Sequence, residues 1–112
     1  MSFKFSRCFL LQTPDVDKAL SFYRDIIGLE PTPSQSGETE LKAGQLRFFL
    51  DKGEPMGPVM EYVVPDLAEA KEKLLAAGCK VVRWDGIGKS CYMRDPFGLV
   101  FNVFQETETF KG

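Results

Sequence analysis

The chain contains an internal repeat, and this repeat limits the folds that its residues can adopt. Pro14-Asp15-Val16 is echoed 51 residues later by Pro65-Asp66-Leu67. Each triplet follows an apolar, strand-like run and opens an amphipathic segment with helical spacing. In a chain of 112 residues, neither half can bury both a helix and a sheet face alone. The halves must therefore pack together or across a dimer.

The apolar spacing predicts two helices of about three turns, one after Asp15 and one after Asp66. Both aspartates suit an N-cap, because a short carboxylate accepts hydrogen bonds from the free N–H groups of the first turn. Gly28 and Gly78 supply the left-handed residue that commonly ends a helix. The residues at helical spacing are Val16, Ala19, Leu20, Tyr23, Ile26 and Ile27 in the first helix, and Leu67, Ala70, Leu74 and Leu75 in the second.

Each predicted helix lies between segments with strand character, which gives the pattern βαβββ twice. The fold class is therefore α+β with a mixed sheet, and the Asp95-Pro96-Phe97-Gly98 run predicts a tight turn. The predicted strands are 5–11, 38–42, 46–50, 59–64, 80–84, 89–94 and 99–105, with 31–37 as a loop. The expected organisation is one domain, 1–112, made of module 1 (about 1–52), a linker (about 52–58), module 2 (about 59–106) and a polar tail (107–112).

Composition excludes several classes of function. The chain has no histidine, which removes the commonest metal ligand and general base. Its three cysteines, Cys8, Cys79 and Cys91, form no CxxC pair, so we expect no disulfide framework and a cytoplasmic location. A net charge of −2 offers no basic field for nucleic acid or an anionic membrane. Neither a bilayer-spanning run nor a secretory signal is visible.

Two segments carry a resemblance to a known family. Residues 14–29 are similar to the opening helix of the glyoxalase/bleomycin-resistance (vicinal oxygen chelate) superfamily, with Asp15, the Phe22-Tyr23 pair and Gly28-Leu29 at matching spacing. Asp95-Pro96-Phe97-Gly98 before an apolar strand resembles a second hallmark of that superfamily. The resemblance implies two tandem βαβββ modules whose sheets curl around a concave cavity, often completed by homodimerisation.

The resemblance also implies where metal ligands would stand. In metal-using members, four side chains, typically His and Glu, point into the cavity from the first and last strands of each module. The matching positions here are Cys8, Phe48, Val59 and Asn102, with Phe48 placed to within one residue. Phe and Val cannot bind a metal, and a thiolate beside a neutral amide suits no common hard divalent ion. We therefore expect neither a metal nor another cofactor, which leaves the metal-free branch that sequesters drugs such as bleomycin.

Strand alternation extends the candidate ligand-binding set. Leu10 should share a face with Cys8, and Glu61 with Val59. A carboxylate within Val59–Val64 is costly to bury unpaired. Two functional interpretations of Glu61 follow: it recognises a cationic or hydrogen-bonding ligand, or it acts as a general base with a raised pKa. The two structural alternatives are a salt bridge with Arg47 or Arg94 and simple exposure to solvent.

The remaining candidates are aromatic or amide side chains. Asn102 can hydrogen-bond a ligand, but equally a neighbouring strand or water. Phe48, Trp84, Tyr92 and Phe104 can form an aromatic wall for a flat ligand, or they are core residues. Buried Cys8 is expected to be inert.

Three functional hypotheses follow. The first is a homodimeric, metal-independent protein that binds a small, partly aromatic and cationic molecule, with drug sequestration as one use. The second is an enzyme of the superfamily (lyase, isomerase, dioxygenase or thiol transferase) that uses displaced metal ligands or Glu61 as its base. The third is a non-catalytic interaction module.

Overall fold

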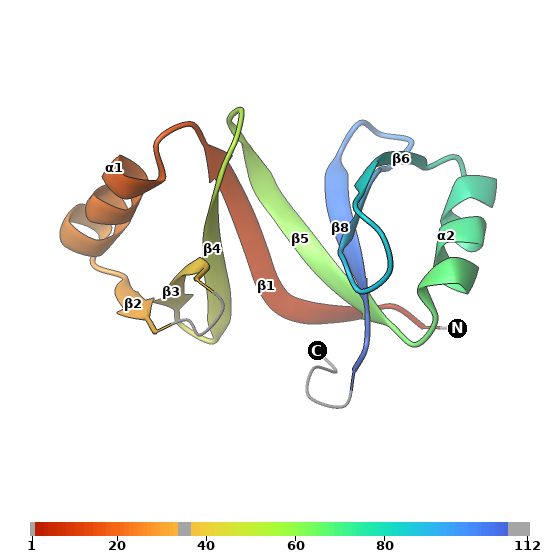
Figure 1. The fold of residues 1–112 in the computed structure, drawn as a ribbon, viewed down its shortest axis with the longest axis horizontal. Coiled ribbons are helices and arrows are strands. Elements are labelled where there is room, and N and C mark those ends of the chain that lie inside the picture. The colour runs from red at the N-terminus through yellow and green to blue at the C-terminus, as the bar shows by residue number, and fades with distance from the viewer. Residues whose placement is uncertain (1, 34–36, 108–112) are drawn as a thin grey trace. The chain divides into compact units, whose positions relative to one another are not determined.

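The computed structural model describes residues 2–33 and 37–107, which form eight β-strands, two α-helices and one π-helix (Figure 1). The chain divides into two compact units, one of residues 7–59 and one of residues 1–6 together with 60–112. We call them the α1 unit and the α2 unit, after the α-helix that each contains. None of the helices in the described residues is long and apolar enough to cross a bilayer.

The α1 unit is a sheet with one helical segment. Its elements are β1 (Lys4–Thr13, of which residues 4–6 belong to the α2 unit), α1 (Val16–Ser21), the π-helix η1 (Phe22–Ile27), β2 (Glu30–Thr32), β3 (Thr39–Ala43) and β4 (Leu46–Lys52). The strand order is β2-β3-β4-β1. β1 and β4 run parallel, with Cys8 opposite Arg47, and the other neighbours are antiparallel.

The α2 unit repeats this arrangement. Its elements are β5 (Met56–Val64, of which residues 56–59 belong to the α1 unit), α2 (Leu67–Ala76), β6 (Lys80–Trp84), β7 (Cys91–Arg94) and β8 (Val100–Gln105). The strand order is β5-β8-β7-β6, with β5 and β8 parallel and the other pairs antiparallel. The α+β class with mixed parallel and antiparallel pairing is thus confirmed.

Both predicted helix starts and both predicted helix ends are confirmed. The Asp15 side chain accepts a hydrogen bond from the Lys18 N–H at 3.0 Å, and that of Asp66 accepts one from the Glu69 N–H at 3.1 Å. Gly28 has φ +90° and Gly78 has φ +99°, values that side chains with a Cβ disfavour. The repeat therefore positions equivalent helices in the two units.

The second half of the first helix differs from the prediction. Residues 22–27 form a π-helix rather than α-helical turns, and the Gly28 N–H bonds the carbonyl of Tyr23, five residues earlier. In a π-helix, i→i+5 bonds replace i→i+4 bonds, which rotates residues off the face that α-helical spacing assigns to them. Ile26 and Ile27, predicted to be buried, are 73% and 54% exposed.

Several strand limits also differ from the sequence pattern. β2 lies within the stretch predicted as a loop, where Pro31 obscures its pattern because proline is a poor strand residue. The expected linker, 52–58, consists of the last residue of β4, a turn at 53–55 and the start of β5. Most of the predicted polar tail, residues 108–112, lies outside the described residues.

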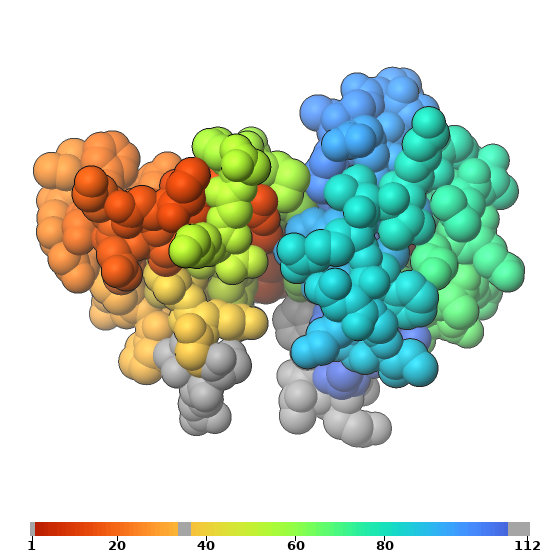
Figure 2. Space-filling view, turned by 45° about the horizontal axis from the view of Figure 1, so that its top comes forward, coloured from red at the N-terminus to blue at the C-terminus, as the bar shows by residue number. Residues whose placement is uncertain are grey.

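Each helix packs on one face of its own sheet, which we call the helix face of that unit. In the α2 unit the buried residues around this face are Val64, Leu67, Ala70, Cys79, Cys91, Met93 and Val103. In the α1 unit they are Leu41, Phe48 and Leu50, with partly buried side chains around them. Figure 2 shows α1 and η1, in orange, at the surface of the molecule. α1 has no buried residue, whereas α2 has two, Leu67 and Ala70.

Candidate functional site

A row of polar side chains crosses the α2 unit on the face opposite its helix. Glu61 on β5 pairs in register with Asn102 on β8, and Asn102 pairs with Tyr92 on β7. Tyr92 in turn pairs with Arg83 on β6. Paired residues of neighbouring strands point to the same side of a sheet. A carboxylate, an amide, a phenol and a guanidinium therefore form one line.

The Arg83 guanidinium lies over the Tyr92 ring, with Cζ 5.2 Å from the ring centroid. In the α1 unit, the Arg47 guanidinium lies over the Phe49 ring in the same way, with Cζ 5.1 Å from the centroid. A guanidinium at such a distance from an aromatic ring makes a cation–π contact. Arg83 also forms an exposed ion pair with Asp85 at 3.3 Å.

Asn102 is the most constrained member of the row. It is 4% exposed, and its Oδ1 accepts no hydrogen bond from any residue that the structure describes. A buried acceptor without a donor costs about 1–3 kcal/mol. Groups of this kind are rare in folded proteins, and a functional role is one of their recognised explanations. Asn102 was predicted to hydrogen-bond a ligand, a neighbouring strand or water, and no described residue donates to its Oδ1.

The other predicted members of this face are Glu61 and Phe104. Glu61 is partly buried and also makes an interaction within the protein. Phe104 follows Asn102 by two residues on β8 and pairs with Val63, so it lies on the same side of the sheet. Arg47, one of the two arginines considered as a partner of Glu61, donates two hydrogen bonds of 2.9 Å to the Glu40 carboxylate.

The α1 unit has an equivalent row with different chemistry. Leu10 on β1 pairs with Phe49 on β4, and Phe49 pairs with Glu40 on β3. Glu40 pairs in turn with Thr32 on β2. Because Leu10 precedes Glu61 by the same 51 residues as the repeat, Phe49 is the counterpart of Asn102.

This register corrects the position assigned to Phe48. Phe48 pairs with Phe9 on the helix face, where its ring lies 4.8 Å from that of Phe9 and 4.9 Å from that of Tyr23. Successive strand residues point to opposite faces, so a shift of one residue moves the position to Phe49.

Trp84 also lies on a helix face. It pairs with Cys91, a member of the buried cluster under α2, and the Lys71 ammonium on α2 lies 3.8 Å from its ring centroid. The irregular register between Val81 and Arg83 shifts the alternation of β6. The sequence pattern gives no signal for this bulge, so Trp84 is not brought together with Tyr92, Asn102 and Phe104.

The remaining predicted residues are Cys8 and Val59, 4% and 1% exposed, both in the α1 unit. Cys8 lies opposite Arg47. Hydrogen bonding to Glu40 raises the pKa of Arg47, so this guanidinium stays charged. Burial raises the pKa of the Cys79 and Cys91 thiols, which keeps them neutral and unreactive.

The residues present do not fit the metal that the fold family implies. With the register applied, the four positions hold Cys8, Phe49, Val59 and Asn102, of which only a thiol and an amide can donate to a metal. Within 2–33 and 37–107, no three His, Cys, Asp or Glu residues are grouped so that they could hold an ion. No chemical step is therefore assigned to a metal.

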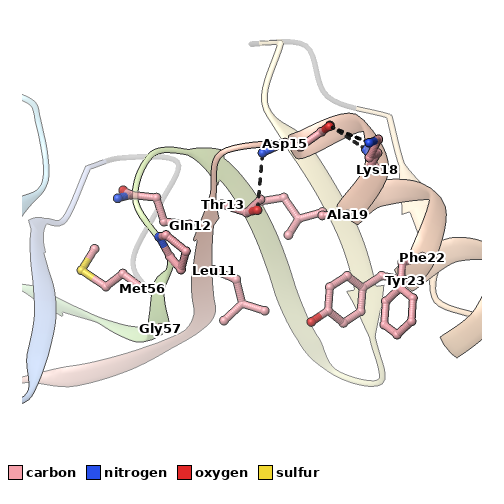
Figure 3. A pocket seen from close by; sticks show the side chains of 12 residues that line it. Leu11, Gln12, Thr13, Asp15, Lys18, Ala19, Phe22, Tyr23, Met56 and Gly57 are labelled. Atoms are coloured by element: carbon pink, nitrogen blue, oxygen red, sulfur yellow. Dashed lines mark hydrogen bonds and ion pairs between the residues drawn. The ribbon is translucent and has the colours of Figure 1, made fainter.

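A pocket that the sequence pattern did not indicate lies on the helix face of the α1 unit (Figure 3). Its volume is about 630 Å³, and it lies between the α1–η1 segment and the turn that joins β4 to β5. None of the nine predicted ligand-binding residues lines it. Such a pocket depends on how far a helix stands from one strand, which periodicity does not encode.

The sequence matches a known family over most of its length. A family model described as a glyoxalase-like domain matches residues 8–104. No curated protein sequence matches the chain.

Solved structures show the same fold at low identity. A hypothetical protein from Bacillus halodurans has a TM-score of 0.65 at 13% identity, with all of both chains covered. Homoprotocatechuate 2,3-dioxygenase from Brevibacterium fuscum has a TM-score of 0.67 at 24% identity, and the match covers 95% of this chain but 37% of the dioxygenase. Methylmalonyl-CoA epimerase from Mycobacterium tuberculosis has a TM-score of 0.60 at 15% identity, with 91% and 87% covered.

Proposed function

The chain belongs to the glyoxalase-like domain family of the vicinal oxygen chelate superfamily, and we propose that it binds a small, partly aromatic, cationic molecule without a metal ion. The proposed contact surface is the row Glu61–Asn102–Tyr92 with Phe104 beside it. The observation that carries the proposal is the buried Oδ1 of Asn102, which accepts no hydrogen bond from the described residues.

The chemistry of the row supports a ligand with both a flat face and donor groups. Tyr92 and Phe104 offer aromatic surface for stacking. Asn102 Oδ1 offers an acceptor, and Glu61, in register with it, offers a negative charge. A carboxylate has about four acceptor sites, so Glu61 can receive a ligand donor beside its contact within the protein. A ligand N–H on Asn102 Oδ1 would relieve an unpaired buried acceptor.

Drug sequestration is the physiological use that we propose, because the metal-free branch of the superfamily includes proteins that sequester drugs such as bleomycin. The proposal includes a cytoplasmic homodimer. Binding requires only shape, stacking and these polar contacts, which agrees with a donor set that does not suit a metal.

The test is titration calorimetry on protein dialysed against EDTA, with metal-free bleomycin and ethidium as probes. Glu61→Gln removes the charge and keeps the shape, so we expect affinity for ethidium to fall about tenfold, or about 1.4 kcal/mol. Asn102→Leu should weaken bleomycin binding. Glu72→Gln, at an exposed position on α2, is the matched control and should bind like the wild type.

Elemental analysis after incubation with zinc, nickel, manganese and iron separates this proposal from an enzyme. We expect no stoichiometric metal. About one metal ion per chain, or probe binding that requires added metal, would contradict the proposal and favour catalysis through displaced ligands. Absence of binding by both probes, or affinities that Glu61→Gln and Asn102→Leu leave unchanged, would also contradict it and favour an interaction module.

A further inference from the structure

The pocket of the α1 unit has an apolar interior and a polar rim. Leu11 and Leu50 contribute from the sheet, Ala19 and Tyr23 from the helical segment, and Met56 from the start of β5. Figure 3 shows Leu11 on its strand, toward Gly57 and Met56, and Tyr23 on the helical segment beside Phe22. Its volume of about 630 Å³ falls within the range of small-molecule sites, roughly 300–1,000 Å³.

The same place in the α2 unit is filled by the protein itself. The repeat and the strand register make Tyr62, Ala70 and Val103 the counterparts of Leu11, Ala19 and Leu50. Ala70 and Val103 are 0% exposed, and Phe3 packs against the cluster that contains them. The Phe5 ring centroid lies 6.1 Å from that of Tyr62. Two phenyl rings of the N-terminal segment thus cover this part of the α2 unit.

The α1 unit lacks those rings. The residues 51 positions after Phe3 and Phe5 are Glu54 and Met56, a carboxylate and a flexible thioether. Ala19 is only partly buried, in contrast to Ala70. By the repeat, the pocket corresponds to the part of the α2 unit near which these two phenyl rings pack, and this correspondence suggests the shape of an occupant.

The pocket also has one aromatic wall and one exposed cation. Phe22 is 48% exposed, and its ring meets that of Tyr23 edge to face at 5.2 Å and 87°. The Lys18 side chain at the rim is 88% exposed. Lys18 Nζ lies 3.9 Å from Asp15 Oδ2 in an exposed ion pair. An ammonium has three donors, so Lys18 can meet a ligand carboxylate at the rim beside this contact.

We propose that this pocket binds a planar aromatic molecule of one or two rings that carries a carboxylate. The rings take the place that Phe3 and Phe5 fill in the α2 unit, and the carboxylate pairs with Lys18. The site lies on the helix face of the α1 unit, whereas the row proposed for cation binding lies in the α2 unit. This inference does not depend on that function.

The test is a fluorescence titration with 2-naphthoate. Met56→Phe places a ring where the α2 unit has Phe5, and we expect it to lower affinity at least tenfold. Ile87→Phe adds the same ring at a position that is 96% exposed, and it should bind like the wild type. Lys18→Gln should weaken 2-naphthoate about fivefold but leave neutral 2-naphthalenemethanol unchanged. Ala19→Leu fills the pocket from the helix side and replaces Met56→Phe if that variant does not fold.

Three results would overturn the proposal. The first is no saturable binding of 2-naphthoate at millimolar concentration. The second is equal affinity in the wild type and in the filled variants. The third is loss of binding in Asn102→Leu, which would place the ligand on the polar row instead. Sedimentation that shows a dimer dissociated by Met56→Phe would identify a second copy of the chain as the occupant and would likewise overturn it.

Discussion

The α1 and α2 units share one chain path but use it differently. α2 buries Leu67 and Ala70, and Phe3 packs against the cluster that contains them. α1 buries no residue fully, and it borders a pocket. On the opposite face the contrast is reversed, because the α1 unit pairs Glu40 with Arg47 whereas the α2 unit leaves Asn102 Oδ1 without a donor among the described residues.

This contrast shows that two copies of one fold can differ in which face is fully packed and which face is left incompletely satisfied. One unit has a densely packed helix face and keeps an unpaired polar group on the other face. The other unit satisfies its buried carboxylate and leaves its helix face open. Unpaired polar groups and unfilled volume both reduce stability, so each unit carries one such feature where a ligand can compensate for it.

The largest expected effect is the loss of stability when a buried side chain is removed at equivalent positions of the two helix-face cores. Leu41 pairs with Phe48 and Met93 with Phe101, and both Leu41 and Met93 are 0% exposed. Replacing either by alanine should cost about 2–5 kcal/mol, with Met93→Ala at the upper end because its denser surroundings cannot collapse around the cavity. Urea unfolding measures both values. A larger cost for Leu41→Ala would break the comparison.

The next expected effect comes from adding side-chain volume to each helix instead of removing it from the core. Ala70→Leu should cost about 1–3 kcal/mol, because Ala70 is fully buried and the helix must move to fit a larger side chain. Ala19→Leu should cost less than about 0.5 kcal/mol, since its side chain extends into the pocket. Thermal unfolding of the two variants checks this. Equal costs would mean that the pocket does not remain open in solution.

A third pair of variants tests the opposite faces and should give opposite signs. Asn102→Leu removes the unpaired acceptor at a similar size and should stabilise the protein by about 1 kcal/mol. Glu40→Leu removes the partner of Arg47 and should destabilise it by about 1–2 kcal/mol, a value reduced because Arg47 is half exposed. Denaturant titration at pH 7 measures both. Destabilisation by Asn102→Leu would indicate that Oδ1 has a partner, such as bound water.

The sequence predicted the features that depend on local chemistry and on the repeat. The caps at Asp15 and Asp66, the glycines that end the helices and most strands follow from residue type and periodicity. Family membership was equally accessible, because the residues of the opening helix carry it. These signals need no knowledge of tertiary packing.

The features that the sequence did not predict depend on non-local geometry. Phe48, placed to within one residue, and Trp84, expected in an aromatic wall or the core, both lie on helix faces. The register of β4 and the bulge in β6 decide this and leave no trace in residue pattern. The π-helix at 22–27 has the same apolar spacing as an α-helix. The pocket depends on how α1, η1 and the start of β5 pack on the sheet, which residue pattern does not encode.

The smallest expected effect concerns the residue at which β1 passes between the units. Arg7 has φ +67°, the left-handed region, and it is the first residue of the α1 unit. A side chain in this region costs roughly 1–2 kcal/mol, whereas glycine adopts it freely but loses more chain entropy, roughly 0.5–1 kcal/mol. Arg7→Gly should therefore be about 0.5 kcal/mol more stable than Arg7→Ala, which loses the same side chain but keeps the Cβ. Urea unfolding compares the two. If Arg7→Ala were the more stable variant, β1 would pass between the units without strain, and the difference between the units would rest on packing alone.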